Sequence, residues 1–382
     1  MQVPLLDLKR QWVAIREAAL RDVTKALDAQ DCILGPRVAA FEEAVAAYCG
    51  AKHAVGCASG TDAILLGLRS LGVRDGEEVI TTPYTFFATA GAIVNAKGRP
   101  VFVDVDPVSF NLDPAQVEAV VTDRTAVIEP VHIFGQCAEM DPLLDIAERR
   151  GLRVLEDAAQ AIGAKDAGRS AGTMGHIGTF SFYPSKNLGG VGDGGMLVTN
   201  DDATAADLKS LRAHGGSVKF VHEQKDAHGG ARRYVHDQVG WNSRLDAIQA
   251  AVLAIKLPLL ESWTEARRAN AQFYDRALVG IDGLRLPREV AGKRHIYNQY
   301  TVLADRRDAL KEHLASKGVG TAIYYPRPLH LQGCFAELGY VEGSFPVSER
   351  LCRENLSLPV FPEMTEDERT YVVECVREFY GA

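Results

Sequence analysis

Short apolar runs alternate with helix-like segments over the first 200 residues of the chain. The run at 53–57 precedes a segment at 61–71 whose apolar residues 64, 65, 68 and 71 share one helical face. The alternation repeats, with apolar runs at 78–81, 100–103, 126–131 and 152–155 and helix-like spacers at 86–95 and 140–150. Because parallel strands need long crossover connections, this pattern predicts an α/β fold with a mostly parallel sheet flanked by helices.

The pattern changes beyond residue 244. Two long helices are predicted there, at 245–260, where Pro258 interrupts the pattern, and at 263–278. The remainder mixes short strands with helices, namely strands at 299–303 and 320–323 and helices at 308–317, 348–355 and 366–380. The change predicts two domains, a large one at 1–257 and a smaller C-terminal α/β domain at 258–382.

The composition narrows the class of protein. Of the 382 residues, 47% are hydrophobic, which is enough for a substantial core. Acidic residues outnumber basic ones by 50 to 42, and basic residues are scattered in pairs such as Arg149-Arg150, so we expect no nucleic-acid partner. No apolar segment approaches the roughly 18 residues that span a bilayer, so we expect no membrane association. The 7 cysteines form no C-x-x-C pair, which is typical of reduced residues in a cytoplasmic protein.

The first candidate site is the segment Ala58-Ser59-Gly60-Thr61-Asp62, between a predicted strand and a predicted helix. Free backbone N–H groups at the start of a helix attract anions, and hydroxyl groups add donors. The segment is therefore a candidate phosphate-binding turn. Ser and Thr are also favoured helix caps, so an ordinary N-cap is the alternative interpretation.

The second candidate is Asp157, which follows the apolar run ending at Leu155. Ligands of open α/β sheets bind beyond such strand ends, so a carboxylate there is well placed for a site. An unpaired charge beside buried residues is costly, and Asp157 therefore requires a cationic partner. The alternative is an Asp that caps a following helix.

The third candidate is Lys186, on a Gly-rich segment between two β-like runs. A lone lysine is usually a solvated surface charge, but among aromatic residues it is desolvated and loses basicity, as a Schiff-base nucleophile requires. Residues 190–195 fit G-x-G-x-x-G, yet a β-like run follows them instead of a helix, so we reject a dinucleotide site. The chain also lacks G-x-x-x-x-G-K-[ST] and H-E-x-x-H, and we expect no metal site.

Together, the three segments have the parts of a pyridoxal 5′-phosphate site. That cofactor requires a lysine for a Schiff base, a carboxylate beside the ring nitrogen and a cradle for its phosphate.

The sequence resembles the pyridoxal-phosphate-dependent nucleotide-sugar aminotransferases of the DegT/StrS family, within the fold-type-I aminotransferases. The resemblance covers nearly the whole chain. Besides the three segments above, it rests on Pro4-Leu5-Leu6-Asp7-Leu8, Gly35-Pro36, Gly240-Trp241-Asn242-Ser243-Arg244-Leu245-Asp246, Tyr325-Pro326 with Pro328-Leu329-His330, and Leu356-Ser357-Leu358-Pro359.

The resemblance implies a role for each matching residue. Lys186 would form the Schiff base and move the substrate proton, and Asp157 would keep the ring nitrogen protonated. The other implied cofactor contacts are Phe86 and Gln160 at the ring, Gly60, Thr61 and Ser181 at the phosphate, and Asn242 at the phosphate held by the neighbouring subunit. The implied substrate contacts are Tyr183, Tyr325 and His330. A core position for Phe86 and a helix cap for Asn242 are the alternatives.

The resemblance also implies a reaction. It is the transfer of an amino group from L-glutamate, which leaves as 2-oxoglutarate, to a keto group of a nucleotide-linked sugar in aminosugar biosynthesis, within a homodimer that shares its active sites. Gln160 favours the C3 keto group over C4. The segment 215–236, rich in His, Lys and Arg, is either a loop for the diphosphate of the sugar nucleotide or a solvated loop.

Two competing functions use the same scaffold. A pyridoxal-phosphate-dependent sugar dehydratase carries His in place of the lysine, so Lys186 argues against it. A catalytically silent regulatory protein would be favoured if Lys186 or Asp157 were missing, and both are present.

Overall fold

The computed structural model describes residues 1–216 and 235–382. Its central sheet consists of the strands His53–Cys57 (β1), Glu78–Thr81 (β2), Arg99–Phe102 (β3), Thr125–Ile128 (β4), Arg153–Asp157 (β5), Ile177–Ser181 (β8) and Gly195–Thr199 (β9). Their order is β1-β9-β8-β5-β4-β2-β3. Neighbours from β8 to β3 run parallel, whereas β9 is antiparallel to both β1 and β8. The predicted mostly parallel sheet is confirmed, with one antiparallel strand, β9, next to the edge strand β1.

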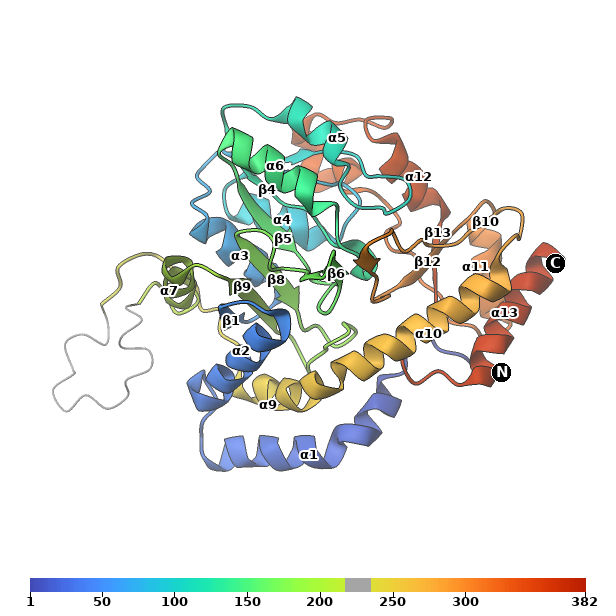
Figure 1. The fold of residues 1–382 in the computed structure, drawn as a ribbon, viewed down its shortest axis with the longest axis horizontal. Coiled ribbons are helices and arrows are strands. Elements are labelled where there is room, and N and C mark those ends of the chain that lie inside the picture. Colours follow the sequence, from blue (N-terminus) through green and yellow to red (C-terminus); the bar gives the residue numbers. More distant parts are fainter. Residues whose placement is uncertain (217–234) are drawn as a thin grey trace.

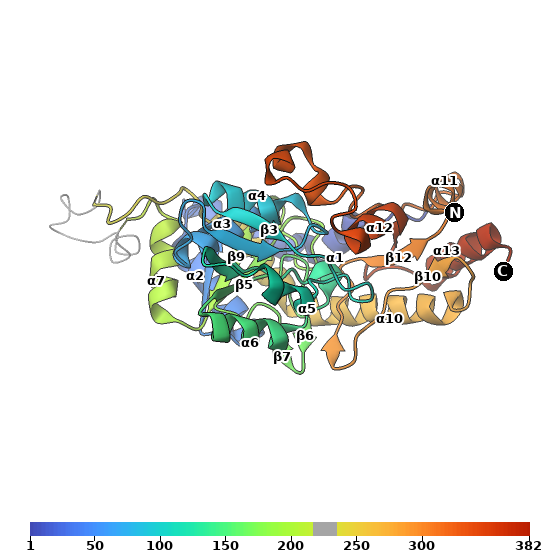
Figure 2. The ribbon, with the colours of Figure 1, turned by 90° about the horizontal axis from the view of Figure 1, so that it is seen from above.

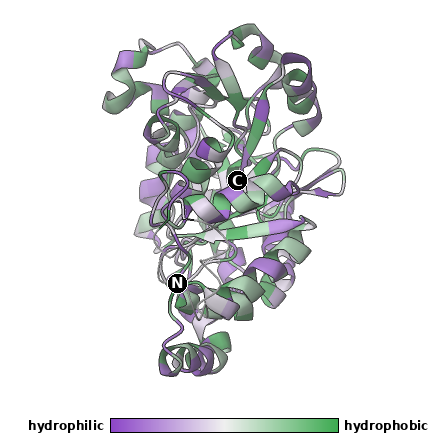
Figure 3. Cartoon of the chain, turned by 90° about the vertical axis from the view of Figure 1, so that its left-hand side faces the viewer, coloured by the Kyte–Doolittle hydropathy of each residue, from purple (hydrophilic) through white to green (hydrophobic). Residues whose placement is uncertain are grey.

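Helices cover both faces of this sheet (Figure 1). One face carries Gly60–Ser70 (α3), Phe87–Asn95 (α4) and Asp202–Leu211 (α7), and the other carries Gly35–Cys49 (α2), Met140–Arg150 (α6) and Ala247–Lys256 (α9). The side chains of successive strand residues point to opposite faces of the sheet, so Val127 packs with α3 and α4 while Ile128 packs with α6. Burial on both sides explains the apolar runs inside these strands, such as Val79-Ile80 and Val154-Leu155. In Figure 3 the strands are green over part of their length and purple elsewhere, and the outer helices mix both colours.

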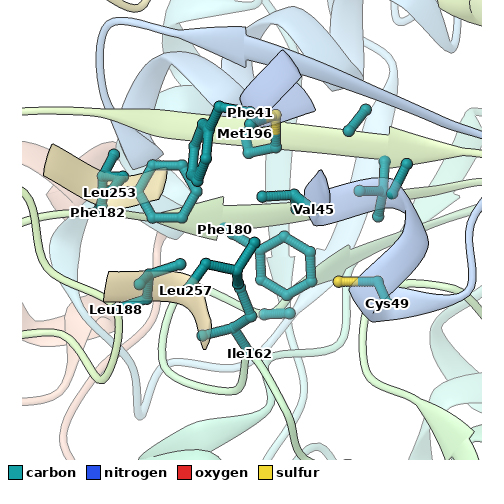
Figure 4. Close-up of a cluster of buried hydrophobic side chains, with 14 of the residues drawn as sticks. Phe41, Val45, Cys49, Ile162, Phe180, Phe182, Leu188, Met196, Leu253 and Leu257 are labelled. Carbon is teal, nitrogen blue, oxygen red and sulfur yellow. The ribbon is translucent and has the colours of Figure 1, made fainter. Parts of the chain in front are cut away.

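A large apolar cluster lies between the sheet and the helices α2 and α9 (Figure 4). Phe182 meets Phe41 of α2 edge to face, with ring centroids 5.5 Å apart. Leu188 and Leu253 of α9 belong to the same cluster. Both Phe182 and Leu188 are fully buried, so the chain between them is anchored in the core at each end.

A second group of elements follows α9. The 3-10 helix Leu257–Leu259 (η3) and the long helix Leu260–Leu278 (α10) lead away from the central sheet (Figure 2). They reach an antiparallel sheet with the order β10-β12-β13, formed by Leu284–Arg285 (β10), Tyr300–Ala304 (β12) and Asn355–Leu358 (β13). Its helices are Arg307–Ser316 (α11), Pro346–Glu354 (α12) and Glu366–Tyr380 (α13).

Smaller elements complete the described chain. Helix Leu8–Asp28 (α1) packs against α9 through Ile15 and Ala19. A further three-stranded sheet has the order β11-β6-β7 and is formed by Lys165–Asp166 (β6), Arg169–Ser170 (β7) and Lys293–Arg294 (β11). The remaining short helices are Pro114–Val117 (α5), Glu118–Val120 (η1), Ile133–Gly135 (η2), Leu329–Leu331 (η4) and Gly333–Leu338 (η5).

Some elements differ from those expected from the sequence. The expected strand at 320–323 is reduced to a single bridge between Ala322 and Ser357. Pro258 lies inside η3, and the helix after it begins at Leu260 rather than at 263. At the N-terminus, Val3 pairs with Val319 and is buried in the apolar cluster of the C-terminal elements. The division into 1–257 and 258–382 stays a prediction, and the first residues pack with the second part.

No helix within the two described ranges is both long and apolar enough to cross a bilayer.

Candidate active site

A cavity of about 510 Å³ opens beyond the ends of β5 and β8, on the sheet face covered by α3 and α4. Strand ends of an open α/β sheet form such a crevice because the chain leaves the sheet there in loops. The cavity brings together nine of the predicted site residues, namely Gly60, Thr61, Phe86, Asp157, Gln160, Ser181, Tyr183, Lys186 and Tyr325.

Lys186 lies on a tight turn after β8. Its backbone N–H donates to the Tyr183 carbonyl at 2.8 Å, and the buried residues Phe182 and Leu188 hold the turn on either side. Burial lowers the pKa of the Lys186 side chain to about 8, while the nearby Asp157 carboxylate opposes this shift. A larger fraction of the amine is therefore neutral at pH 7 than in a surface lysine, which nucleophilic chemistry requires.

Asp157 is the last residue of β5 and is 4% exposed. Its Oδ2 accepts a hydrogen bond from Thr89 Oγ1 of α4 at 2.8 Å, and its Oδ1 accepts one from the Ala159 amide at 3.1 Å. Burial raises the pKa of the Asp157 carboxyl, and these hydrogen bonds and the Lys186 charge counteract that rise. No helix begins between β5 and β6, so the alternative of a helix-capping Asp does not hold. The carboxylate lines the cavity, and no cation of residues 1–216 or 235–382 forms an ion pair with it.

A second carboxyl group, Glu129, lies beside Asp157 just after β4 on the neighbouring strand. Its side chain is fully buried, and neither oxygen has a hydrogen-bond partner in the described part of the chain. Burial raises the pKa of Glu129 well above its ordinary value, and the Asp157 charge adds to this rise. Burial therefore favours the protonated form of Glu129, whereas hydrogen bonds and the Lys186 charge favour the ionised form of Asp157.

The first turn of α3 forms another wall of the cavity. Ser59 caps the helix, since its Oγ accepts a hydrogen bond from the Asp62 amide at 3.1 Å. The amides of Gly60 and Thr61 have no acceptor among the described residues, and both residues line the cavity. A Cβ on Gly60 would lie 2.6 Å from the Ser181 Cβ, so glycine is needed for this close approach. The capping interpretation thus applies to Ser59. The anion-binding interpretation applies to Gly60 and Thr61, whose free N–H groups are available for a phosphate.

Gln160, Tyr325 and Phe86 form a further part of the wall. Gln160 is held by both ends of its amide, because Nε2 donates to the Tyr325 hydroxyl at 3.1 Å and Oε1 accepts from the Phe134 amide at 2.7 Å. The Phe86 ring lies 6.1 Å from the Tyr325 ring. Phe86 is 55% exposed, so it is not a core residue.

Two predicted site residues lie elsewhere. His330 is 1% exposed, pairs with Glu349 through Nε2 at 3.1 Å, packs against Phe345 and does not line the cavity of its own chain, and its contact with substrate stays a prediction. Asn242 is exposed and does not line the cavity of its own chain. Helix α9 begins at Ala247 with Asp246 as its N-cap, which removes the helix-cap alternative for Asn242. Of the candidate loop 215–236, residues 217–234 lie outside the described residues.

The cavity also contains residues that the sequence analysis missed, among them Asn298, Gln299 and Tyr324. Asn298 Nδ2 donates to Asn187 Oδ1 at 2.8 Å, which links the residues before β12 to the turn that carries Lys186. Tyr324 precedes the recognised Tyr325-Pro326 motif and could have been found from it. Asn298 lies in an irregular segment without periodicity, so no sequence signal marks it.

The fold and the cavity together define a fold-type-I aminotransferase scaffold. The chain belongs to the DegT/DnrJ/EryC1/StrS aminotransferase family, whose model matches residues 13–377. The family resemblance stated from the sequence is therefore confirmed.

Known relatives cover the whole chain. The "Pleiotropic regulatory protein" of Geobacillus stearothermophilus is 49% identical over 100% of this chain and 99% of the relative. The UDP-N-acetyl-3-dehydro-alpha-D-glucosamine 3-aminotransferase of Acidithiobacillus ferrooxidans is 42% identical over 98% of this chain and 97% of the relative. The crystal structure of S. venezuelae DesV in complex with a ketimine intermediate is 40% identical, has a TM-score of 0.93, and covers 100% of this chain and 99% of that chain.

Proposed function

We propose that the protein is a pyridoxal-phosphate-dependent aminotransferase that moves an amino group from L-glutamate to a keto group of a nucleotide-linked sugar, in aminosugar biosynthesis in the cytoplasm. The observation that carries this proposal is the convergence of Lys186, Asp157 and the free amides at the start of α3 on one cavity. The names of relatives that act on nucleotide sugars support the substrate class.

The residues present fit pyridoxal 5′-phosphate. The group has a phosphate, a basic ring nitrogen and an aldehyde, which match the α3 amides, the Asp157 carboxylate and the Lys186 amine. When bound, it supplies an electrophilic carbonyl and a ring that withdraws electrons from the reacting carbon. Related structures with bound pyridoxamine phosphate support this assignment.

The protein's own residues then have distinct tasks. Lys186 Nζ is desolvated, so it serves first as a nucleophile and then as the base that moves a proton at the substrate carbon. Asp157 holds a negative charge in a fixed position, because Thr89 and the Ala159 amide orient both of its oxygens. The amides of Gly60 and Thr61 would bind phosphate oxygens, and Phe86 and Tyr325 would cover the ring.

The amino donor, the position of the keto group and the nucleotide require a direct test. Gln160, held rigidly at the wall, and the 3-aminotransferase name of the A. ferrooxidans relative both favour C3 over C4. Purified protein is incubated with 2-oxoglutarate and a panel of 3-amino and 4-amino sugar nucleotides, and glutamate formation is measured. We expect ping-pong kinetics with 3-amino sugars and no turnover by Lys186→Ala. Turnover of 4-amino sugars alone would overturn the C3 assignment, and turnover of none would overturn the substrate class.

We further propose that two chains complete each site. Phe86 and Tyr183 are each 55% exposed while they line the cavity, and Asn242 is exposed outside it, so a second copy can cover the opening and bring its own Asn242 to the phosphate. In a twofold dimer every site then contains residues of both chains.

Mixing two inactive variants tests this arrangement. Lys186→Ala and Asn242→Asp, refolded together, should recover activity that approaches about a quarter of wild type, because about half of the dimers are mixed and each has one intact site. Full activity of Asn242→Asp alone, or an active monomer in sedimentation, would contradict the shared site.

A second candidate function is regulation by binding, which the name of the Geobacillus stearothermophilus relative supports. A regulatory protein on this scaffold would bind cofactor and sugar nucleotide without turnover. Ligand binding by calorimetry without glutamate formation from any member of the panel would favour this function over catalysis.

A further inference from the structure

Lys256 is a buried cation outside the cavity whose role the proposed reaction does not explain. It is the last residue of α9, it is 5% exposed, and its Nζ donates to the Gly189 carbonyl at 2.6 Å. That carbonyl is its one hydrogen-bond acceptor in the described part of the chain. Burying an ammonium group costs free energy that one carbonyl does not fully return, so Lys256 is a candidate for a role beyond stability.

Gly189 lies three residues after Lys186 on the same tight turn. The turn folds back on itself, because the Gly190 amide donates to the Phe182 carbonyl at 2.7 Å and a Cβ on Gly189 would lie 2.2 Å from the Pro184 carbonyl oxygen. Gly189 does not line the cavity, and its carbonyl accepts the hydrogen bond of Lys256 from the C-terminal end of α9. A change in its direction would therefore move the backbone that carries Lys186.

A second residue of α9 holds the same segment. Gln249 Oε1 accepts a hydrogen bond from the Val191 amide at 2.9 Å. Gln249 and Lys256 are seven residues apart and thus share one helical face. Between them, Leu253 belongs to the apolar cluster that includes Leu188 (Figure 4). One face of α9 thus contacts the segment 188–191 through three side chains: Gln249 accepts a hydrogen bond, Leu253 packs against it, and Lys256 donates a hydrogen bond.

We propose that Lys256 is a positioning residue, which together with Gln249 fixes the turn 186–191 and so sets the place of the Lys186 amine in the cavity. The expected effect of Lys256 on turnover rests on the proposed function. Its expected effect on the backbone of the turn is independent of that function. Burial lowers the pKa of Lys256 to about 8 and Glu363 counteracts this shift, so most of the ammonium is charged at pH 7.

The test compares Lys256→Met with Lys293→Met. Methionine keeps the length and the apolar stem of lysine and removes the donor. Lys293 is the control, because its side chain is 4% exposed and also donates to a backbone carbonyl, that of Ala138, at 2.9 Å, but away from the cavity; unlike Lys256 it also pairs with Asp166 at 3.1 Å. A structural role alone would lower the melting temperature of both variants and leave the turn unchanged.

The first measurement needs no cofactor. Hydrogen exchange of the protein without cofactor is followed in peptides that cover residues 183–195. We expect Lys256→Met to speed exchange of the amides of Gly190 and Val191 by about tenfold or more, while Lys293→Met leaves it at the wild-type rate. Unchanged exchange in folded Lys256→Met would overturn the proposal, whatever the outcome for catalysis.

The second measurement uses the protein loaded with pyridoxal 5′-phosphate. The pH at which the visible band of the lysine-linked cofactor titrates should shift in Lys256→Met, and kcat should fall by about 10- to 100-fold with little change in KM. Gln249→Met should change the pH of the titration and kcat in the same direction as Lys256→Met, but by a smaller amount. This second variant tests the proposal even if Lys256→Met does not fold. A wild-type band and kcat in both variants would contradict the positioning role.

Discussion

Glu156 and Asp157 are adjacent on β5, yet their carboxylates lie on opposite faces of the sheet in different surroundings. Glu156 is fully buried and accepts hydrogen bonds from His132 Nε2 at 2.8 Å and from the amides of Gly172, Met174 and Gly175 at 2.5–2.7 Å. The Ala138 amide donates to His132 Nδ1, so the ring proton is on Nε2 and points to Glu156. Asp157 has only the Thr89 hydroxyl and one amide, and beside it Glu129 has no partner at all within the described chain.

The difference separates a structural carboxylate from a functional one. A buried charge that is fully hydrogen-bonded stabilises the fold, whereas one that lacks donors requires a further partner. Asp157 faces the cavity and can accept further hydrogen bonds there, whereas the Glu156 carboxylate does not face the cavity. Adjacent acidic residues in the sequence thus have different roles because the strand alternates its side chains between faces.

The largest expected effect is on catalysis by Asp157→Asn. The amide preserves shape but removes the charge that the cofactor's ring nitrogen would need, so kcat should fall by about 100- to 1,000-fold with nearly unchanged stability. Steady-state kinetics of the loaded protein measure this change.

Glu156→Gln is the matched control for Asp157→Asn. Its carboxylate has four donors and no cavity contact, so this substitution should lower the free energy of unfolding by about 1–3 kcal/mol and leave the kcat of the folded fraction within threefold of wild type. A loss below about tenfold in Asp157→Asn, or equal kinetic losses in both variants, would remove the distinction between the two faces.

Much of this site could be predicted from the sequence. Lys186, Asp157 and the start of α3 are found because a strand end, an apolar run and a Gly-rich turn are local patterns. Asn298 was missed because it reaches the cavity from an irregular segment that local patterns do not place, whereas Tyr324 adjoins the recognised Tyr325-Pro326 motif and could have been found from it. The helices α1 and α2 and the antiparallel direction of β9 likewise depend on tertiary packing.

The next effect concerns Glu129 and depends on pH. Its pKa is raised above the ordinary 4.5 in the folded chain, so the folded state retains a proton that the unfolded state releases above this pH. The contribution of Glu129 to stability is therefore fully present below pH 4.5 and is lost as pH rises toward the folded pKa, by up to about 1.4 kcal/mol per pH unit.

Glu129→Leu should remove this dependence. The stability difference between variant and wild type, measured by urea unfolding from pH 5 to pH 8, should increase in favour of the variant as the pH rises. Parallel stability curves would show that Glu129 is ionised in the folded protein and that Asp157 is not the sole charged member of the pair.

The smallest expected effect is that of Thr89→Val. This substitution removes one of the two donors that orient Asp157 and should lower kcat by about three- to tenfold. Thr301→Val is its control, since the Thr301 hydroxyl is also buried and bonded, at 2.8 Å to Ser357, but lies in the C-terminal sheet. Kinetic losses of similar size in the two variants would indicate a general effect of buried hydroxyl loss.

The central claim, that Lys186 is the reacting amine of the cavity, has a direct measurement. The purified protein is loaded with pyridoxal 5′-phosphate, reduced with borohydride and digested, and the modified peptide is identified by mass spectrometry. We predict one reduced cofactor per chain, attached to Lys186, and loss of the visible band on reduction. Attachment to another lysine, such as Lys256, or an intact visible band in Lys186→Ala with activity retained, would contradict the account.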